Sequence, residues 1–377
     1  MSARRLRAAR HLHAARREEE RVTPLELFFD LVFVLAITQC TALMADEPTW
    51  RGLTKGLLVL GVLWWAWVGY AWLTSVVDPE EGGVRLVMFA AMAAFLVVAL
   101  CVPKAFDTLG LTFAVAYGLV RAGQIALFVL ASRDDAAMRR SVIGLAISSA
   151  IGVGLLVGAY FLHGTTQGGL WVVALLLDAG GPFLFGAEGW QLVPGHFAER
   201  HGLIVIIALG ESIVAIGVGS AAGVTAGVIA AAVLGMTLAA TMWWAYFDVV
   251  ASVAARRLSS RPEGKQRNEM ARDSYSYLHF PMVASIILVA LGMKQTLGHV
   301  DDPLTTVPAV ALIGGTAVYL LSHVAFRLRN FRTINKERLL LALLLLALLP
   351  LGTEVPAIAA LAVCAGLMVL MIAYEAI

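Results

Sequence analysis

Residues 27–33 read LFFDLVF, an apolar stretch that carries a single aspartate, Asp30. Two phenylalanines precede this residue, and Leu31, Val32 and Phe33 follow it. An ionised carboxylate is costly to hold among apolar side chains, so it needs a proton, a cation or a basic partner. This stretch therefore raises two questions: in what medium it lies, and which group compensates the charge of Asp30.

Apolar stretches of this kind recur along the whole chain. Of its 377 residues, 60% are hydrophobic and only 14% are charged, and the charged residues are clustered. A soluble domain of this size needs more polar surface than that to cover itself. The stretches between the charge clusters reach about 20 residues, the length at which an α-helix crosses a bilayer. The composition therefore predicts an all-α fold, a polytopic transmembrane helix bundle.

About twelve segments are long and apolar enough to be predicted as spans. They are residues 24–44, 54–76, 84–103, 108–131, 140–161, 168–187, 198–218, 224–250, 275–294, 304–326, 336–353 and 355–374. An even number of spans predicts that the N-terminus and the C-terminus lie on the same side of the membrane.

The basic residues orient these spans. With the N-terminus in the cytoplasm, most of the 28 Lys and Arg residues fall in cytoplasmic segments, as the positive-inside rule requires. Residues 1–23 are then a basic cytoplasmic tail. We expect that they do not form a cleaved signal peptide, because no short apolar core with a small-residue cleavage site follows.

The two halves of the chain resemble each other. LWWAWVGY, which starts at Leu63, reappears as MWWAYFDV, which starts at Met242, and MFAAMAAFLVVALCVPKA aligns without gaps with HFPMVASIILVALGMKQT. Four such matches occur in the same order, so we predict two six-helix transmembrane repeats, residues 24–187 and residues 198–374. Because each repeat has six spans, the two are related in parallel, about an axis along the membrane normal.

Ionisable side chains within the predicted spans define a candidate site. Such groups normally face the interior of a bundle and pair there. Glu26 and Asp30 are four residues apart and share one helix face. The proposed path for an ion, a proton or a substrate consists of Glu26, Asp30, Arg121, Glu199, Arg200, His201, Glu211 and His323.

The repeat suggests partners within this set, because it brings Asp30 opposite Glu211 and Arg121 opposite His323. We expect Arg121 to pair with Asp30 or Glu26, and His323 to play the equivalent part for Glu211. A structural ion pair, a proton or cation relay and a substrate contact all remain open for the buried members.

Residues near the predicted cytoplasmic interface have a simpler alternative. Glu26, Glu199 and Arg200 can be helix-end charges that reach water. His196, Glu199 and His201 cannot share one helical face, so we expect no metal there. A phosphate-binding glycine loop is also missing, and we expect no cofactor.

Tryptophan pairs occupy equivalent places in the two halves. Trp64 and Trp65, with Trp243 and Trp244, form a predicted aromatic lining. Helix packing and an interfacial belt are the commoner uses of tryptophan in membrane proteins.

Three motifs appear in order: TPLELFFDLVFVLAI, WWAWVGYAWLTS and HFAERHGLIVIIALGESIVAIG. Together they resemble the signatures of the low temperature requirement protein A (LtrA) family. The resemblance implies a multi-pass protein of the bacterial cytoplasmic (inner) membrane, linked by name to growth in the cold, and it supplies no biochemical activity. The first motif is also similar to the opening of the first helix in the bacterial and lysosomal potassium-channel family, which favours an ion path along the first and seventh helices.

These observations predict a transporter or channel-like protein for protons, cations or a small solute, with its polar core between the two halves. Asp30 and Glu211 would take the coupling charge. The alternatives are a membrane-embedded enzyme or lipid-handling factor in cold adaptation, or a scaffold that does not transport. We expect the lipid bilayer as a partner and no nucleic acid, and the oligomeric state stays open.

Overall fold

The computed structural model describes residues 21–184 and 189–376, so most of the predicted basic tail lies outside the described residues. The described residues form helices and turns, with no β-strand among them. Eleven of the helical segments are long and apolar enough to cross a membrane. This confirms the predicted all-α, polytopic helix bundle.

Twelve longer helices make up most of the described residues. They are α2 (Pro24–Asp46), α3 (Trp50–Val76), α4 (Gly82–Cys101), α5 (Gly110–Ala131), α6 (Ala136–Tyr160), α7 (Gly164–Leu184), α8 (Pro194–Gly219), α9 (Ala226–Phe247), α12 (His279–Gly298), α14 (Gly315–Phe331), α15 (Lys336–Leu348) and α16 (Ala357–Glu375). The shorter helices are η2 (Val102–Lys104), η3 (Ser220–Ala222), α10 (Val250–Ser259), α11 (Lys265–Met270), η4 (Ala271–Tyr277), α13 (Thr306–Ala309), η5 (Val310–Gly314) and η6 (Leu349–Thr353).

The predicted span 336–353 is the one that does not correspond to an observed helix of membrane-crossing length. Its helix α15 has 13 residues and then tightens into the 3₁₀ turn η6. The first turn carries Lys336, Glu337 and Arg338, so the apolar part is shorter than the roughly 20 residues that a crossing helix needs. The described residues therefore contain eleven helices of membrane-crossing length instead of about twelve.

Two compact units make up the described chain. The first comprises the described part of Met1–Cys40, with Leu58–Arg200 and Leu258–Arg272; the second comprises Thr41–Leu57, His201–Arg257 and the described part of Asp273–Ile377. This division into compact units does not test whether the two halves of the chain share a fold. The repeats at 24–187 and 198–374 therefore stay a prediction. The topological side of the termini is likewise still a prediction.

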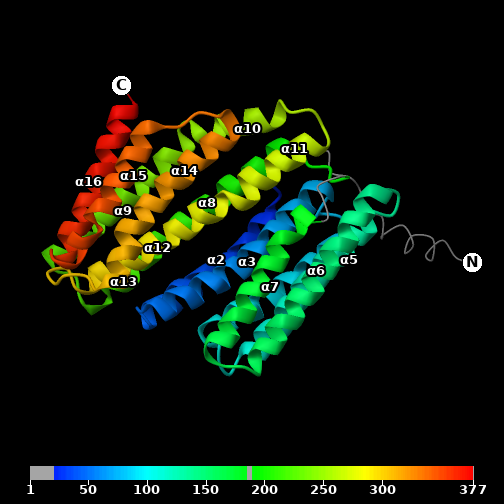
Figure 1. The fold of residues 1–377 in the computed structure, drawn as a ribbon, viewed down its shortest axis with the longest axis horizontal. Helices are drawn as coiled ribbons and strands as arrows, with labels where there is room; N and C mark the ends of the chain where they lie inside the picture. The colour runs from blue at the N-terminus through cyan, green and yellow to red at the C-terminus, as the bar shows by residue number, and fades with distance from the viewer. Residues whose placement is uncertain (1–20, 185–188, 377) are drawn as a thin grey trace, which may run out of the picture. The chain divides into compact units, whose positions relative to one another are not determined.

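In the first unit, α4, α5, α6 and α7 pack in sequence, each helix against the next (Figure 1). Short connections between helices produce this antiparallel order. Helix α6 begins at Asp135, whose side chain accepts hydrogen bonds from the backbone N–H groups of Ala137 and Met138, both at 3.0 Å. Residues 59–77, which belong mostly to α3, are almost entirely buried and form the centre of this unit.

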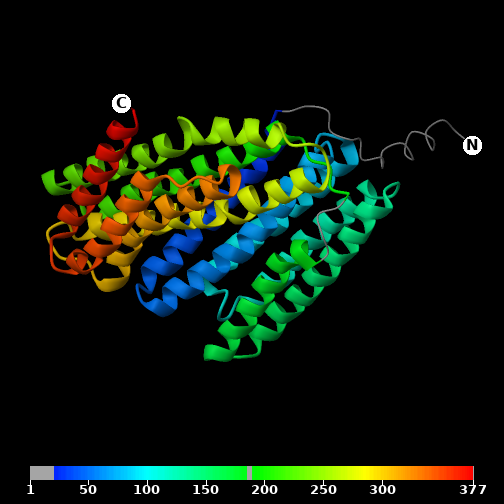
Figure 2. The ribbon, with the colours of Figure 1, turned by 45° about the horizontal axis from the view of Figure 1, so that its top comes forward.

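In the second unit, α9 packs against α16, and α14 packs against both α12 and α15. Figure 2 shows α12 and α14, coloured yellow and orange, side by side. The segment η5 and residues 273–277 of η4 are π-helical. Such insertions into a helix are frequent near functional sites, because they redirect the side chains of one turn.

Candidate functional site

A capping box at the start of α2 holds Glu26. The N–H and the hydroxyl of Thr23 donate to Oε2 of Glu26 at 2.9 and 3.0 Å, and the N–H of Glu26 donates back to Thr23 Oγ1 at 3.4 Å. Threonine three residues before glutamate, with Pro24 in the first turn, is the sequence pattern for this cap. One oxygen of Glu26 is occupied by the cap, which leaves Oε1 available to another helix.

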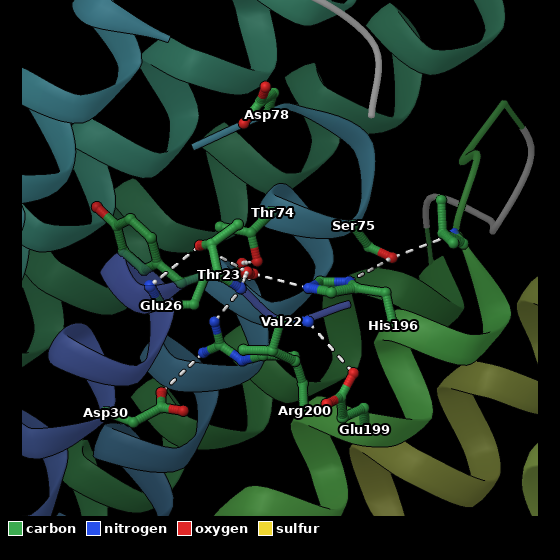
Figure 3. Close-up of polar contacts among 12 residues, drawn as sticks. Val22, Thr23, Glu26, Asp30, Thr74, Ser75, Asp78, His196, Glu199 and Arg200 are labelled. Carbon is green, nitrogen blue, oxygen red and sulfur yellow. Dashed lines mark hydrogen bonds and ion pairs between the residues drawn. The ribbon is translucent and has the colours of Figure 1, made fainter. Parts of the chain in front are cut away.

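Helix α8 supplies the partners of that oxygen. His196 Nε2 lies 2.8 Å from Glu26 Oε1, and Arg200 Nη1 lies 3.1 Å from the same atom (Figure 3). His196 and Arg200 are four residues apart, so both project from one face of α8. All three side chains have an exposed fraction of 0%, which places the contact out of reach of water.

Arg200 also reaches the second carboxylate of α2. Its Nη2 donates to Asp30 Oδ1 at 2.7 Å, and the indole N–H of Trp67 donates to the same oxygen at 2.8 Å. The guanidinium carbon of Arg200 lies 5.6 Å from the centre of the Trp67 ring, a cation–π distance. Oδ2 of Asp30 is buried and has no hydrogen-bond partner among the described residues. We call Glu26, Asp30, His196 and Arg200 the α2–α8 cluster.

The four side chains of the α2–α8 cluster, taken alone, have formal charges that balance when they hold one proton. Two ionised carboxylates carry two negative charges, and Arg200 supplies one positive charge. Unbalanced charge is strongly disfavoured in a buried, apolar site. A proton on His196 or on one carboxyl group makes the total zero, and the 2.8 Å contact between His196 and Glu26 is a place where a proton can be shared. The cluster thus contains groups that can gain or lose a proton.

A pocket lies beside this cluster in the same unit. It has a volume of about 580 Å³, and Ser75, Trp190 and Val193 are among the residues that line it. Ser75 Oγ accepts a hydrogen bond from the N–H of Val193 at 3.2 Å and lies 3.5 Å from His196 Nδ1. Ser75 thus connects the pocket wall to the imidazole of the cluster.

Arg121 occupies a different buried network, so its predicted pairing with Asp30 or Glu26 is wrong. Arg121 Nη2 lies 2.8 Å from Asp178 Oδ1, and Tyr117 donates to Asp178 Oδ2 at 2.7 Å. Every N–H-bearing nitrogen of the Arg121 guanidinium has an acceptor among Ser149, Asp178, Gln124 and Trp65. This network joins α5, α6 and α7, carries balanced charge and has no open donor, as a structural ion pair does.

The residues that were predicted near the cytoplasmic membrane interface differ in their exposure to solvent. Arg200 is fully buried, so the interpretation of it as a helix-end charge that reaches water is wrong. Glu199, one residue before Arg200 on α8, is exposed and accepts a hydrogen bond from the N–H of Val22 at 3.2 Å. Figure 3 shows Glu199 pointing away from the pair formed by Arg200 and Asp30.

The other path residues belong to the second unit. The ring centre of His201 lies 5.2 Å from that of Tyr275 and 5.3 Å from that of His279. Glu211 is buried, with an exposed fraction of 3%. His323 Nδ1 contacts Arg338 Nη1 at 3.0 Å, so the expected pairing of His323 with Glu211 is not found.

The two tryptophan pairs have different surroundings. Trp64 and Trp65 are buried in the first unit, where Trp64 stacks on Trp67 at 5.2 Å between ring centres. Trp243 and Trp244 have exposed fractions of 44% and 48%. The sequence repeat therefore does not give the two pairs equivalent burial, and only the first pair lies in a protein interior.

Sequence reasoning left His196, Trp67 and Asp178 out of the predicted path. A signal for His196 was present, because His196 and Arg200 repeat on α8 the four-residue spacing of the two acids on α2. Trp67 and Asp178 carried no such signal, since their contacts depend on which helices become neighbours. Among the described residues, no group of three or more His, Cys, Asp or Glu side chains is arranged to hold a metal ion.

A bundle of membrane-length helices with a buried, charged cluster defines a polytopic helical membrane protein. The chain belongs to the family described as bacterial low temperature requirement A protein (LtrA), whose sequence model matches residues 21–373. It is 32% identical over 333 residues to an uncharacterized protein of Rhizobium meliloti (strain 1021), which covers 83% of this chain and 79% of that protein. No solved structure matches the chain.

Proposed function

We propose that this membrane protein is a transporter or channel-like protein for protons, cations or a small solute, and that the α2–α8 cluster carries its coupling proton. The observation that supports the proposal most directly is the odd charge of the cluster. Intramembrane acids and histidines are characteristic of proton and ion pathways. The formal charges of the four side chains of the cluster balance when they hold one added proton, whereas the contact between Arg121 and Asp178 is balanced without one.

The geometry suggests how proton binding changes the pairing. With a proton on His196, its imidazolium neutralises Glu26, and the single charge of Arg200 is left for Asp30. Without that proton, Arg200 must neutralise two carboxylates at once. The strength of the contact between Arg200 and Asp30 therefore depends on protonation at His196. Asp30 Oδ2, which has no hydrogen-bond partner among the described residues, is the acceptor available to a proton or to a transported cation.

Access to the cluster is provided in this proposal by the 580 Å³ pocket. Ser75 has a hydroxyl that can donate and accept, so it can pass a proton between pocket water and His196 Nδ1. Glu199, Arg121, His201, Glu211 and His323 keep their place in the proposed path as residues still to be tested.

The test uses purified protein in sealed liposomes that contain a pH dye. Proton, sodium and potassium gradients are imposed in turn on the wild type, Glu26→Gln and Asp30→Asn. Glutamine can still complete the capping box, and asparagine can still accept from Trp67 and Arg200, so both variants are expected to fold. We expect wild-type proton or cation flux that falls at least about tenfold in both variants, because neither amide can take the charge.

Glu47→Gln is the matched control, since Glu47 follows the same helix and pairs with Lys55 on the surface, at 3.0 Å. Its flux should equal that of the wild type. Wild-type liposomes without flux of any of the three ions would contradict an ion path. Folded Glu26→Gln and Asp30→Asn proteins with wild-type flux would remove the cluster from the mechanism.

A further inference from the structure

The second unit contains a pocket of about 650 Å³ to which the proposed function assigns no ligand, although His323 of the proposed path is among its lining residues. The pocket lies among five helix ends: the end of α9, the start of α10, the end of α14, the start of α15 and the end of α16. The volume is within the range of pockets that hold small molecules. Ends of membrane-crossing helices lie at the depth of lipid headgroups, so the ligand of this pocket is to be sought there.

One wall of the pocket is a preformed polar clamp. Glu375 accepts from Arg338 Nε at 2.8 Å and from Nη2 at 2.7 Å, a bidentate pair. Arg338 donates its third bond to His323 Nδ1 at 3.0 Å, and Asn335 Nδ2 donates to Glu375 Oε1 at 3.0 Å. These charges neutralise each other, so the clamp shapes the pocket without supplying a free charge to a ligand.

Two further charged groups line the same pocket and keep open hydrogen-bonding positions. Arg327 donates Nε to Thr333 Oγ1 at 3.0 Å, and its two terminal nitrogens make no hydrogen bond among the described residues. The carboxylate of Asp248, just after α9, likewise has no hydrogen-bond partner in the described part of the chain. The pocket thus offers one open guanidinium and one open carboxylate, which match a ligand with one anionic and one cationic group.

The rest of the wall is apolar. Trp244, Val249, Phe331 and Ile372 contribute to it. Trp244 and Val249 also have exposed fractions of 48% and 58%, so the apolar wall continues onto the outer surface of α9 and the residues that follow it. Tryptophan is enriched at the boundary between headgroups and acyl chains. A ligand that fits this wall has an apolar part that leaves the pocket along the helix.

We propose that this pocket is a binding site for a phospholipid with a zwitterionic headgroup that ends in a primary ammonium, the phosphatidylethanolamine class. The phosphate pairs with the terminal nitrogens of Arg327, because guanidinium groups bind phosphate oxygens in a bidentate manner. The ammonium donates to Asp248, and an acyl chain lies along Trp244 and Val249. This site uses no residue of the α2–α8 cluster.

The test measures lipid binding to the full-length protein in detergent by native mass spectrometry, supported by thermal stabilisation. The probes are dioctanoyl phosphatidylethanolamine, dioctanoyl phosphatidylglycerol and glycerophosphoethanolamine, which has the headgroup without acyl chains. We expect dioctanoyl phosphatidylethanolamine to bind most tightly of the three probes. Arg327→Gln should weaken the binding of both lipids by roughly tenfold or more. Asp248→Asn should weaken only phosphatidylethanolamine and so abolish the selectivity between the two lipids.

Arg256→Gln and Asp134→Asn are the matched controls, because both residues are exposed and lie outside the pocket. They should bind all probes like the wild type. Selectivity is a ratio measured on one folded sample, so partial loss of protein does not change it. Equal selectivity in Asp248→Asn and the wild type would overturn the proposal. Glycerophosphoethanolamine that binds as tightly as the lipid would also overturn it, in favour of a water-soluble solute.

Discussion

Arg200 and Asp30 form a fully buried ion pair, with 2.7 Å between Nη2 and Oδ1. The same guanidinium lies 3.1 Å from Glu26, so one basic side chain of α8 serves two acids of α2. A pair of this kind is stable only while its charges balance. Arg200 is therefore the residue that links the two acids of α2, and a change at this position tests both contacts at once.

Arg200→Gln should destabilise the protein by about 3–5 kcal/mol, because it removes the positive charge that both buried carboxylates contact. Adding Asp30→Asn should restore part of that loss, so that the double variant loses less than the sum of the two single variants. The free energies of unfolding of the wild type, the two single variants and the double variant form a double-mutant cycle, which is measured by chemical unfolding in detergent followed by circular dichroism. Arg256→Gln is the control. Additive losses would mean that Arg200 and Asp30 do not interact.

His196→Gln should keep the fold and lose proton coupling. Glutamine can donate to Glu26 in place of the imidazole, but it cannot bind a proton near neutral pH. In the liposome assay we expect proton flux at least about tenfold below that of the wild type, with no dependence on pH between about 5 and 8. His163→Gln, a change of an exposed histidine between α6 and α7, should behave like the wild type. Retained pH dependence in His196→Gln would place the coupling proton elsewhere.

The network around Arg121 should respond as a structural ion pair. Arg121→Gln leaves Asp178 buried without its charge partner and should cost about 3–5 kcal/mol of unfolding free energy. Tyr117→Phe removes one hydrogen bond to the same carboxylate and should cost less, about 1.5–3 kcal/mol. Unfolding titrations of both variants check this order. A loss in Tyr117→Phe that exceeds the loss in Arg121→Gln would contradict it.

Gly69 is a position where α3 approaches a neighbouring side chain closely. A Cβ at this position would overlap the side-chain amide of Gln124, which also accepts a hydrogen bond from Arg121. Gly69→Ala should therefore destabilise the protein by about 1–3 kcal/mol. Gly154, within α6, has open space where an added methyl group would lie, so Gly154→Ala should be neutral or slightly stabilising. Equal thermal stability of the two variants would show that the approach at Gly69 is looser than described.

Glu47 lies between α2 and α3, outside the membrane-crossing segments, and its pair with Lys55 gives a small, pH-dependent contribution to stability. The hydrogen bond from Lys55 lowers the pKa of Glu47 below its usual value of 4.5. The folded state thus binds a proton more weakly than the unfolded state, so the pair stabilises the fold above that usual pKa. The contribution is lost as the pH falls through the lowered pKa of the folded state.

Lys55→Gln should consequently lower stability by less than about 1 kcal/mol at neutral pH, because the pair is partly exposed. The difference from the wild type should vanish in strong acid and shrink with added salt. Melting temperatures measured across pH test both statements. A difference that grows as the pH falls would reverse the assigned sign.

Much of the architecture could be predicted from the chain alone. The predicted segments 24–44 and 140–161 correspond to α2 and α6, whose observed bounds are Pro24–Asp46 and Ala136–Tyr160. Apolar length and polar caps are local properties, so they can be recognised without knowledge of neighbouring helices. The segment 336–353 differed because three charged residues occupy its first turn.

The candidate site could be predicted only in part. The spacing of Glu26 and Asp30 correctly indicated a shared face of one helix, and the capping box is visible as Thr-Pro-Leu-Glu. Spacing along a chain sets the direction of a side chain on its own helix, but it does not say which helix lies opposite. Arg121 was therefore assigned to the wrong acid, although a buried arginine with an acidic partner was correctly expected.

Taken by itself, the sequence determined that the chain is a helical membrane protein and that Asp30 must be compensated, because both follow from the cost of polar groups in an apolar medium. Only the tertiary structure decided that Arg200 and Trp67 provide the compensation, and that Arg121 pairs with Asp178. The physical reason is that ion pairs and hydrogen bonds act over about 3 Å. Such contacts are decided by which helix faces meet, and residues 170 positions apart become partners only through packing.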